Sequence, residues 1–445
     1  MTKKLFYLLL CTTIMLFNAC GDDKEDGGYK TFSVTVELSY PTNSLSAVEG
    51  IEVKLNDTNT NASFTSNTDA AGKAAFTVPA GIYEASATDK RYADGTAYLY
   101  NGVKSNIAIS DQWKEGDVVK LELAESKTNQ LVIKELYCAG CQKDDGSGAF
   151  YHDRYIILYN NSDGEVALDD VCLAMVLPYN SNANSNADYQ GDALFYEAEN
   201  WIPAGQGVWY FTSEVKLQPG KQIVIALANA VDNTTLYSNS INHANANYYC
   251  TYDPEQYNNA AYYSVDDIIP VSHHLKAYRY GTGNAWPLSQ VSPAVFIFQP
   301  KGVELSSFIA DATTTNNYNN TSSQIRKKVP VEWVIDAIEV FRGDATNNYK
   351  RLTKAVDAGY VNMIGQQGYT LYRNVDKEAT EAIEGNQGKL VYNYSLGTAD
   401  EVVGTTDPSA IDAEASIKNG ARIIYKDTNN SSNDFHQRKK ASLRD

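Results

Sequence analysis

Short runs in which apolar and polar residues alternate recur along most of the chain and predict β-strands joined by turns. Residues 32–38 and 51–55 alternate with period two, which places apolar side chains on one face of a strand. Residues 155–159 and 223–227 are apolar and β-branched runs of strand length, too short for a helix standing alone. Turn-forming Asn, Asp and Gly follow at 160–164. The pattern predicts an all-β protein.

Residues 29–124 are predicted to form a first domain, which is long enough for one small core. Three phrases, Gly50-Ile-x-Val-x-Leu, Asp69-x-x-Gly-x-Ala-x-Phe and Pro79-Ala-Gly-x-Tyr, resemble the carboxypeptidase-regulatory or Cna-B type of prealbumin-like β-sandwich. The resemblance implies a stalk or spacer. Asp57 and Asp69 are expected in loops as turn residues, with calcium binding as the alternative.

Residues 129–445 are predicted to form a second domain. Its strand and turn phrases at 131–137, 155–175, 217–220, 334–341 and 368–373, closed by Asp427-Thr-Asn-Asn-Ser-Ser-Asn-Asp-Phe435, resemble the lamin-tail domain. That resemblance implies an immunoglobulin-like β-sandwich with a binding or architectural role and no shared catalytic centre. We therefore expect two consecutive β-sandwich domains.

A large irregular insertion is expected within the second sandwich, at about 178–330. Its Asn-rich start, residues 179–189, is polar and turn-forming, and we expect it outside the core. Long insertions between strands often carry function. The chain has 32 tyrosines, which combine a flat apolar face with a hydroxyl group, and the insertion concentrates them. The predicted ligand- or partner-binding residues are Tyr248, Tyr249, Tyr252, Tyr262, Tyr263, Tyr278, Tyr280 and Trp286. The alternative is that these rings are half-buried parts of the sandwich.

The first residues predict export and lipid attachment. Two lysines precede an apolar run at 5–17, as in a secretory signal, and the run is too short to span a bilayer. The sequence Phe17-Asn-Ala-Cys20 resembles a bacterial lipobox, which implies a signal peptide at 1–19 and a lipid on Cys20. Ordinary signal cleavage is the alternative. The acidic, glycine-containing tether 20–28 is similar to the surface-export signal of Bacteroidota lipoproteins; a simple solvated linker is the other interpretation. We expect a lipid-anchored, surface-exposed outer-membrane protein.

Charge and cysteine content narrow the function classes. The formal net charge of −17 opposes nucleic-acid binding, because no basic stripe is available to displace counterions from phosphates. Four cysteines remain beyond the signal peptide and its lipobox: Cys138, Cys141, Cys172 and Cys250. In an exported protein they could form up to two disulfides, or simply be buried. Redox chemistry at the C-x-x-C of residues 138–141 and a zinc site are minor alternatives, and no cofactor is expected.

Catalytic motifs are not evident in the sequence. It has no Gly-x-Ser-x-Gly elbow, no phosphate-binding Gly-Lys loop and no His-Glu-x-x-His. His273 and His274 are adjacent, so on a strand they would point to opposite faces. The carboxylate pairs 144–145, 169–170 and 266–267 could act as acid and base or hold calcium, but solvated turns explain them as well. No catalytic or metal-binding residue is predicted.

The lipoprotein start, the segments 228–232 and 285–298, and the end at 433–444 together resemble a Bacteroidota lipoprotein family of unknown function. Members of such families often accompany TonB-dependent outer-membrane transporters, so a transporter is an implied partner. Our main hypothesis is a non-enzymatic surface lipoprotein that captures a ligand, or docks on such a transporter, through the aromatic insertion. The alternatives are a carboxylate-dependent hydrolase acting on glycan, and a cell-surface adhesin or structural protein.

Overall fold

A computed structural model describes residues 30–41, 47–93, 96–114, 116–127, 131–182, 185–212, 214–318, 324–343, 345–392 and 406–444. The expected signal peptide 1–19, the tether 20–28 and Cys20 lie outside the described residues. No described helix is long and apolar enough to cross a membrane.

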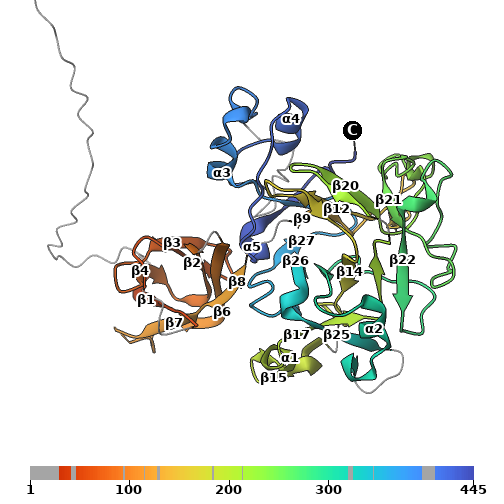
Figure 1. The fold of residues 1–445 in the computed structure, drawn as a ribbon. Helices are drawn as coiled ribbons and strands as arrows, with labels where there is room; N and C mark the ends of the chain where they lie inside the picture. The colour runs from red at the N-terminus through yellow and green to blue at the C-terminus, as the bar shows by residue number, and fades with distance from the viewer. Residues whose placement is uncertain are drawn as a thin grey trace, which may run out of the picture.

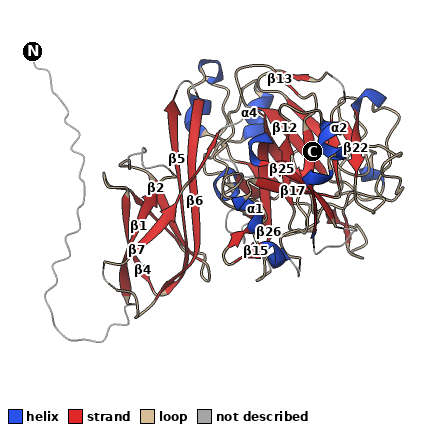
Figure 2. Ribbon diagram, turned by 60° about the horizontal axis from the view of Figure 1, so that its bottom comes forward, coloured by secondary structure: helices blue, strands red, loops and turns tan. Residues whose placement is uncertain are grey.

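The chain is all-β, as predicted, and its first eight strands pair only with one another. They are β1 (Thr31–Ser39), β2 (Glu52–Asp57), β3 (Ser63–Asn67), β4 (Lys73–Pro79), β5 (Gly81–Ala93), β6 (Thr96–Ile109), β7 (Val118–Glu122) and β8 (Ala124–Lys127). One sheet has the order β4-β1-β7 and the other β3-β2-β5-β6-β8. The two sheets enclose a core of their own, so this first unit is a β-sandwich (Figures 1 and 2).

The alternation read from the sequence explains this core. Val34, Val36 and Leu38 point inward from β1 while the residues between them are more exposed. Asp57 and Asp69 are turn residues, as expected: Asp57 accepts hydrogen bonds from the backbone of Asn59 and Thr60, and Asp69 accepts them from the turn that follows it.

The second unit is built on one twelve-stranded sheet, coloured yellow to blue in Figure 1. In spatial order its strands are β27 (Val361–Met363), β26 (Val334–Arg342), β23 (Ala294–Phe298), β14 (Cys172–Met175), β18 (Gly207–Tyr210), β22 (His274–Arg279), β21 (Tyr249–Thr251), β20 (Gln222–Ala226), β12 (Tyr155–Asn160), β9 (Leu131–Tyr137), β28 (Thr370–Arg373) and β29 (Phe435–Arg438). Because β9 also packs against β26, and β27 against β29, the sheet curls until it is nearly closed. Its interior holds the largest apolar core.

Short elements cover the outside of this sheet. The three-stranded sheet β17-β25-β24 and helix α2 pack over β14 and β23. The segment that carries α3 and α4 packs over β9 and β28. The bounds of the remaining strands and helices are β10 (Cys141–Gln142), β11 (Ala149–Phe150), β13 (Val166–Ala167), β15 (Tyr189–Gln190), β16 (Ala193–Leu194), β17 (Trp201–Gly205), β19 (Lys216–Leu217), β24 (Thr315–Asn317), β25 (Ile325–Pro330), α1 (Phe195–Ala198), α2 (Leu305–Ala310), α3 (Lys377–Glu381), α4 (Ala413–Lys418) and α5 (Ser431–Asp434).

Residues 178–330 do not interrupt the second unit as an irregular insertion. They contribute β18, β20, β21, β22 and β23 to the twelve-stranded sheet, so most of this stretch is part of the fold. Two residues of its Asn-rich start, which was expected outside the core, are also buried. Asn180 is buried and its amide donates to the carbonyl oxygen of Val340 across 2.6 Å, and Asp188 is buried against Arg326. Polar side chains enter the interior here because partners within the protein satisfy them.

The two units touch through the hairpin β5–β6 and the loop before β29. The side chain of Asn433 donates to the hydroxyl oxygen of Thr88 at 3.1 Å, and the Asn101 amide donates to the carbonyl oxygen of Thr428. Figure 1 shows α5, which belongs to this loop, beside β8 and β6. These hydrogen bonds tie the first unit to the end of the second.

Candidate functional site

Two of the eight predicted binding residues are core residues, which corrects the prediction for them. Tyr263 and Trp286 are buried inside the twelve-stranded sheet. The Tyr263 hydroxyl oxygen accepts a hydrogen bond from the Trp286 backbone N–H at 2.8 Å. The Trp286 indole N–H donates to the carbonyl oxygen of Gly207 at 3.1 Å. Each polar group of these rings is satisfied within the fold, so neither side chain is presented to a partner.

Two further predicted residues lie between layers of the fold. The Tyr278 ring stacks on the Tyr210 ring with their centroids 5.0 Å apart. The Tyr280 hydroxyl donates to the carbonyl oxygen of Ala204 in β17 at 2.9 Å, and burial raises its pKa well above the ordinary value. Both rings pack against the apolar cluster beneath β17 and β25, so their main contacts are structural.

Tyr248, Tyr249 and Tyr252 are partly buried and surround the histidine pair. Tyr249 stacks on His273 with 4.1 Å between ring centroids, and Tyr252 meets His274 edge-on at 5.3 Å. The two neighbouring imidazoles therefore engage different tyrosines. Among the described residues, no group of three His, Cys, Asp or Glu side chains is arranged to hold a metal ion.

The last predicted residue, Tyr262, belongs to a continuous series of aromatic contacts that we term the aromatic patch: Tyr237, Phe150, His152 and Tyr262. The ring centroids of Tyr237 and Phe150 are 5.0 Å apart, those of Phe150 and His152 are 5.7 Å apart, and those of His152 and Tyr262 are 4.9 Å apart. All four rings are partly exposed. The patch thus joins residues of three separate segments into one accessible aromatic surface.

Local structure fixes each of the three segments. Phe150 ends β11, which pairs with β10 in a short hairpin. The Asp144 carboxylate of this hairpin accepts the backbone N–H of Ser238 at 3.0 Å, which holds the Tyr237 loop against the hairpin. Tyr262 lies in a turn closed by a 2.9 Å hydrogen bond from its N–H to the carbonyl oxygen of Asn259. The positions of the rings are therefore set by backbone contacts beneath them.

The electrostatics of the patch leave it weakly charged. Burial lowers the pKa of His152, so its imidazole is neutral at neutral pH. The ammonium group of Lys143 lies 5.9 Å from the centroid of the Tyr237 ring. Beneath the patch, the guanidinium of the buried Arg154 lies 5.9 Å from the Tyr262 ring and donates to the carbonyl oxygen of Leu288 at 2.6 Å. The patch can therefore offer flat apolar faces with a cation at one end.

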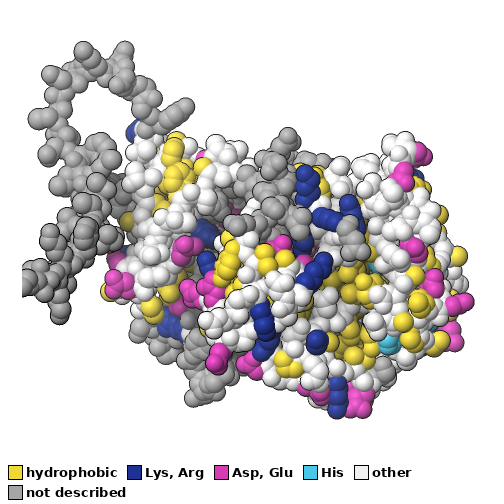
Figure 3. Space-filling view, turned by 90° about the horizontal axis from the view of Figure 1, so that it is seen from above, with side chains coloured by type: hydrophobic (Ala, Val, Ile, Leu, Met, Phe, Trp, Pro, Cys, Tyr) yellow, Lys and Arg dark blue, Asp and Glu magenta, His cyan; other side chains and the backbone are white. Residues whose placement is uncertain are grey.

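One exposed apolar side chain adjoins the patch, and two more lie further along the chain. Leu236 directly precedes Tyr237 and is 60% exposed. Ile268 is 51% exposed, and Val271, which begins the short 3₁₀ helix Val271–His273 before β22, is 80% exposed. Figure 3 shows hydrophobic side chains gathered on the second unit with a histidine beside them. Surface of this kind often marks an interaction site.

The four cysteines within the described residues form no disulfide. Cys138, Cys141, Cys172 and Cys250 are all buried free thiols. Cys138 packs with its sulfur 3.8 Å from the Met363 sulfur. Burial raises the pKa of the Cys138 and Cys141 thiols to about 12, so both are protonated and poor nucleophiles at neutral pH. Their contribution is to packing.

The carboxylate pairs considered as acid–base candidates are turn residues. Asp144 holds Ser238, Asp145 accepts the N–H of Ser147 at 2.9 Å, and Asp266 accepts the N–H of Ile268 at 3.0 Å. Asp170 has a left-handed backbone conformation, with φ of 56°, as a tight turn requires. The pairs belong to different turns.

One buried carboxylate outside those pairs has an unusual environment. Asp153 accepts hydrogen bonds from the hydroxyl groups of Ser240, at 2.7 Å, and Tyr137, at 3.3 Å. Burial raises its pKa to about 6. The side chain is fully enclosed, so it has no access to a substrate in this conformation.

Of the four patch residues, only Tyr262 was predicted from the sequence as a site residue; Tyr237, Phe150 and His152 were missed. The available signal was the run Phe150-Tyr-His152, three consecutive aromatic side chains directly after a glycine-rich turn. Its contact with the later tyrosines depends on the fold.

Comparisons with known proteins place this fold next to a family of unknown function. Residues 218–393 match the family described as protein of unknown function (DUF4876). The chain is similar in structure to a DUF4876 family protein from Bacteroides thetaiotaomicron VPI-5482, with a TM-score of 0.51, 19% sequence identity and coverage of 91% of this chain and 94% of that one. A DUF3823 family protein from Parabacteroides merdae ATCC 43184 matches 34% of this chain and 67% of its own, with 10% identity and a TM-score of 0.16. No curated protein matches.

Proposed function

We propose that this protein is a surface-attached binding protein that captures its ligand or partner through the aromatic patch, without chemical turnover. The observation that carries the proposal is the unbroken contact series Tyr237–Phe150–His152–Tyr262, in which all four rings keep part of their surface exposed. Protein cores bury such rings where they can, so a contiguous set left accessible is typical of a recognition surface.

The energetics support recognition by these side chains. An aromatic ring buries a large area on binding and has only two side-chain torsions to immobilise. The rings of the patch already constrain one another, which lowers the entropy cost further. Losing one such contact at the centre of an interface costs on the order of 2 kcal/mol. Leu236, exposed beside Tyr237, would extend the apolar contact area.

The proposed setting is the outer surface of a bacterial outer membrane. A lipid on Cys20 would anchor the chain, and the acidic residues at 20–28 would act as its export signal and tether. The proposed partner is a TonB-dependent transporter or the ligand that such a transporter imports. The neutral character of His152 and the single cation near Tyr237 favour a partner surface that is itself apolar or aromatic.

The test compares a patch variant with a matched tyrosine control. The triple variant Phe150→Ala, Tyr237→Ala and Tyr262→Ala removes three rings, while Tyr392→Ala removes a ring that is 43% exposed in the segment after α3. Each full-length protein is cross-linked in its native outer membrane, purified and quantified for associated transporter, after circular dichroism has shown that it is folded. The parent and the control should retain the partner and the triple variant should lose it. Equal recovery by the folded triple variant would refute the proposal.

A separate measurement addresses turnover. The purified protein is incubated with glycan and peptide substrates, and the products are followed by mass spectrometry. The proposal expects no products. Hydrolysis that is abolished by changing a single carboxylate would establish the enzymatic alternative instead.

A further inference from the structure

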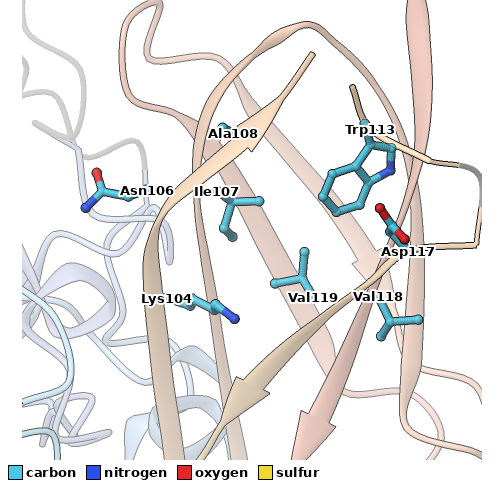
Figure 4. A pocket seen from close by; sticks show the side chains of 8 residues that line it. All are labelled: Lys104, Asn106, Ile107, Ala108, Trp113, Asp117, Val118 and Val119. Atoms are coloured by element: carbon cyan, nitrogen blue, oxygen red, sulfur yellow. The ribbon is translucent and has the colours of Figure 1, made fainter. Parts of the chain in front are cut away.

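The first unit contains a pocket of about 310 Å³ between the free edges of its two sheets. β8 pairs only with Tyr98–Asn101 of β6, so from Lys104 onward that side of β6 has no neighbouring strand among the described residues. β7 pairs on one side with β1 and is the edge of its sheet. The pocket opens where these two edges face each other (Figure 4), lined by Lys104, Asn106, Ile107, Ala108, Trp113, Asp117, Val118 and Val119.

One wall of the pocket is a fixed aromatic ring. The indole N–H of Trp113 donates to the carbonyl oxygen of Ser33 at 2.9 Å, which holds the ring against the sandwich while leaving it partly exposed. Ile107 and Val119 are buried and form an apolar floor. Figure 4 shows these three side chains around one space, with the Asp117 carboxylate just below the indole. A rigid ring over an apolar floor is a surface on which a flat ligand can stack.

The rim carries one cation and one anion. The Lys104 ammonium donates to the carbonyl oxygen of Lys120 at 3.2 Å, and one oxygen of the Asp117 carboxylate accepts the N–H of Lys114 at 3.2 Å. Both side chains are exposed and keep further hydrogen-bonding capacity, since an ammonium has three donors and a carboxylate has about four acceptor positions.

This lining disfavours two classes of occupant. An extended peptide could pair with the free edge of β6 or of β7, but both edges carry lysines, and lysines on edge strands oppose strand addition. The side chain of Lys104, on β6, also occupies the Lys120 carbonyl oxygen of β7. A ligand with several charges of one sign gains little here, because Lys104 and Asp117 both border the space and one of them always has the same sign as the ligand. The remaining class is a neutral molecule with a flat apolar face and a hydroxylated edge.

We propose that this pocket binds a neutral saccharide, with one sugar ring stacked on Trp113 and its hydroxyl groups bonded to Asp117 and Lys104. The C–H face of a sugar ring suits the negative face of the indole, and its hydroxyl groups can both donate to a carboxylate and accept from an ammonium. The cavity volume is at the lower end of the range for small-molecule sites, which suits one or two sugar units or the end of a longer glycan.

This site shares no residue with the aromatic patch, so the two proposals stand or fall separately. Saccharide binding at Trp113 would make the first unit a glycan-contacting module. It would also give a surface-attached binding protein a second point of attachment. Two linked sites bind a shared target more tightly than either alone, because binding at one raises the effective concentration at the other.

The test uses the full-length protein in detergent and immobilised neutral oligosaccharides of glucose, galactose, mannose and xylose, with polygalacturonate and an extended peptide as competing probes. Titration calorimetry with the best neutral oligosaccharide then gives its affinity. Trp113→Ala and Asp117→Asn should each weaken binding about tenfold. Lys54→Ala, which changes a lysine on β2 that does not line the pocket, and the triple patch variant should leave the affinity unchanged.

If Trp113→Ala does not fold, Asp117→Asn still tests the proposal, because Asp117 is an exposed rim residue whose replacement should not disturb the fold. The proposal is overturned if no neutral oligosaccharide binds, or if the folded variants bind as tightly as the parent. It is also overturned if polygalacturonate or the peptide is the ligand whose binding depends on Trp113.

Discussion

Tyr263 and Trp286 are joined by a 2.8 Å hydrogen bond in which the tyrosine hydroxyl oxygen accepts the backbone N–H of the tryptophan. Both side chains are buried among apolar residues inside the twelve-stranded sheet. The aromatic residues that make this stretch unusual in sequence thus serve two purposes, because some build the interior while Tyr237 and Tyr262 remain accessible at its surface.

Replacing Tyr263 by phenylalanine removes only that hydroxyl group and leaves the Trp286 N–H buried without its acceptor. We expect the free energy of unfolding to fall by about 1–3 kcal/mol, the usual cost of such a group. Urea denaturation followed by circular dichroism measures the change. Tyr237→Phe, which alters a partly exposed ring, should change it by less than about 0.5 kcal/mol. Equal stability of the two variants would show that the hydrogen bond is not structural.

Asp188 lies between two buried arginines, and its removal should be among the most destabilising single changes. Its carboxylate is 2.6 Å from the Arg326 guanidinium and also pairs with Arg351. Asp188→Asn would leave two buried positive charges without their counter-charge, and breaking a buried pair in this way costs about 3–5 kcal/mol.

The control is an exposed ion pair whose charged groups are separated by the same distance. Asp163 and Arg422 also approach to 2.6 Å, but the Asp163 side chain is almost fully exposed. Asp163→Asn should therefore cost at most about 1 kcal/mol. Comparing the denaturation midpoints of the two variants tests whether burial decides the cost; similar losses would contradict this.

His243 should make the protein less stable in acid. The side chain is fully buried, and burial lowers its pKa from 6.5 to about 4. Between pH 6.5 and about 4 the unfolded chain binds a proton at His243 that the folded chain does not bind. The stability that comes from burying the neutral imidazole is therefore complete above pH 6.5 and is lost as the pH falls to about 4. The shift corresponds to about 3 kcal/mol.

His243→Asn tests this, since its amide can still donate to the Asn229 carbonyl oxygen that the imidazole Nδ1 faces at 3.0 Å. The stability of the variant should fall less steeply than that of the parent between pH 6.5 and 4. Asp153, whose pKa is raised to about 6, has the opposite effect: it makes the folded state more stable as the pH falls from 6 to its unfolded pKa. Both proteins contain Asp153, so its effect cancels when their stability profiles are subtracted. Parallel pH profiles would refute the assignment to His243.

Cys20→Ala should detach the protein from the membrane, because lipid attachment requires the cysteine thiol. We expect the variant in the soluble fraction after cell fractionation and the parent in the membrane fraction. Cys250→Ala, at a buried cysteine of β21, should remain with the membrane. A Cys20→Ala protein that still sediments completely would show that anchoring does not depend on this residue.

The sequence predicted the strands well where apolar runs are long or alternate cleanly. β9, β12, β20 and β26 lie within one residue or so of the predicted runs. β21 spans three residues within a polar, Asn-rich stretch, and both its partners are parallel, so no local pattern marks it. Polar, Asn-rich sequence of this kind is why residues 178–330 were predicted to be an insertion, although they contribute five strands to the twelve-stranded sheet.

The candidate site could be predicted only in part for a related reason. An aromatic residue has the same local pattern whether it enters the core, as Trp286 does, or stays at the surface, as Tyr262 does. The difference depends on which strand or loop lies beneath it. The contact between Phe150 and Tyr237 joins segments far apart in sequence, and tertiary contacts of this kind cannot be read from composition or periodicity.

The placement of β29 has a consequence for biosynthesis. β9 begins the second unit, yet one of its sheet neighbours is β28 and the next strand beyond is β29, formed by Phe435–Arg438. A nascent chain therefore carries the apolar strand β9 for most of its synthesis before β28, which pairs with one of its edges, emerges. The first unit needs nothing beyond Lys127 to complete its sheets, so it can fold without waiting for the second unit. The second unit must stay unfolded much longer, so we expect it to be the part of the chain that engages holdase chaperones.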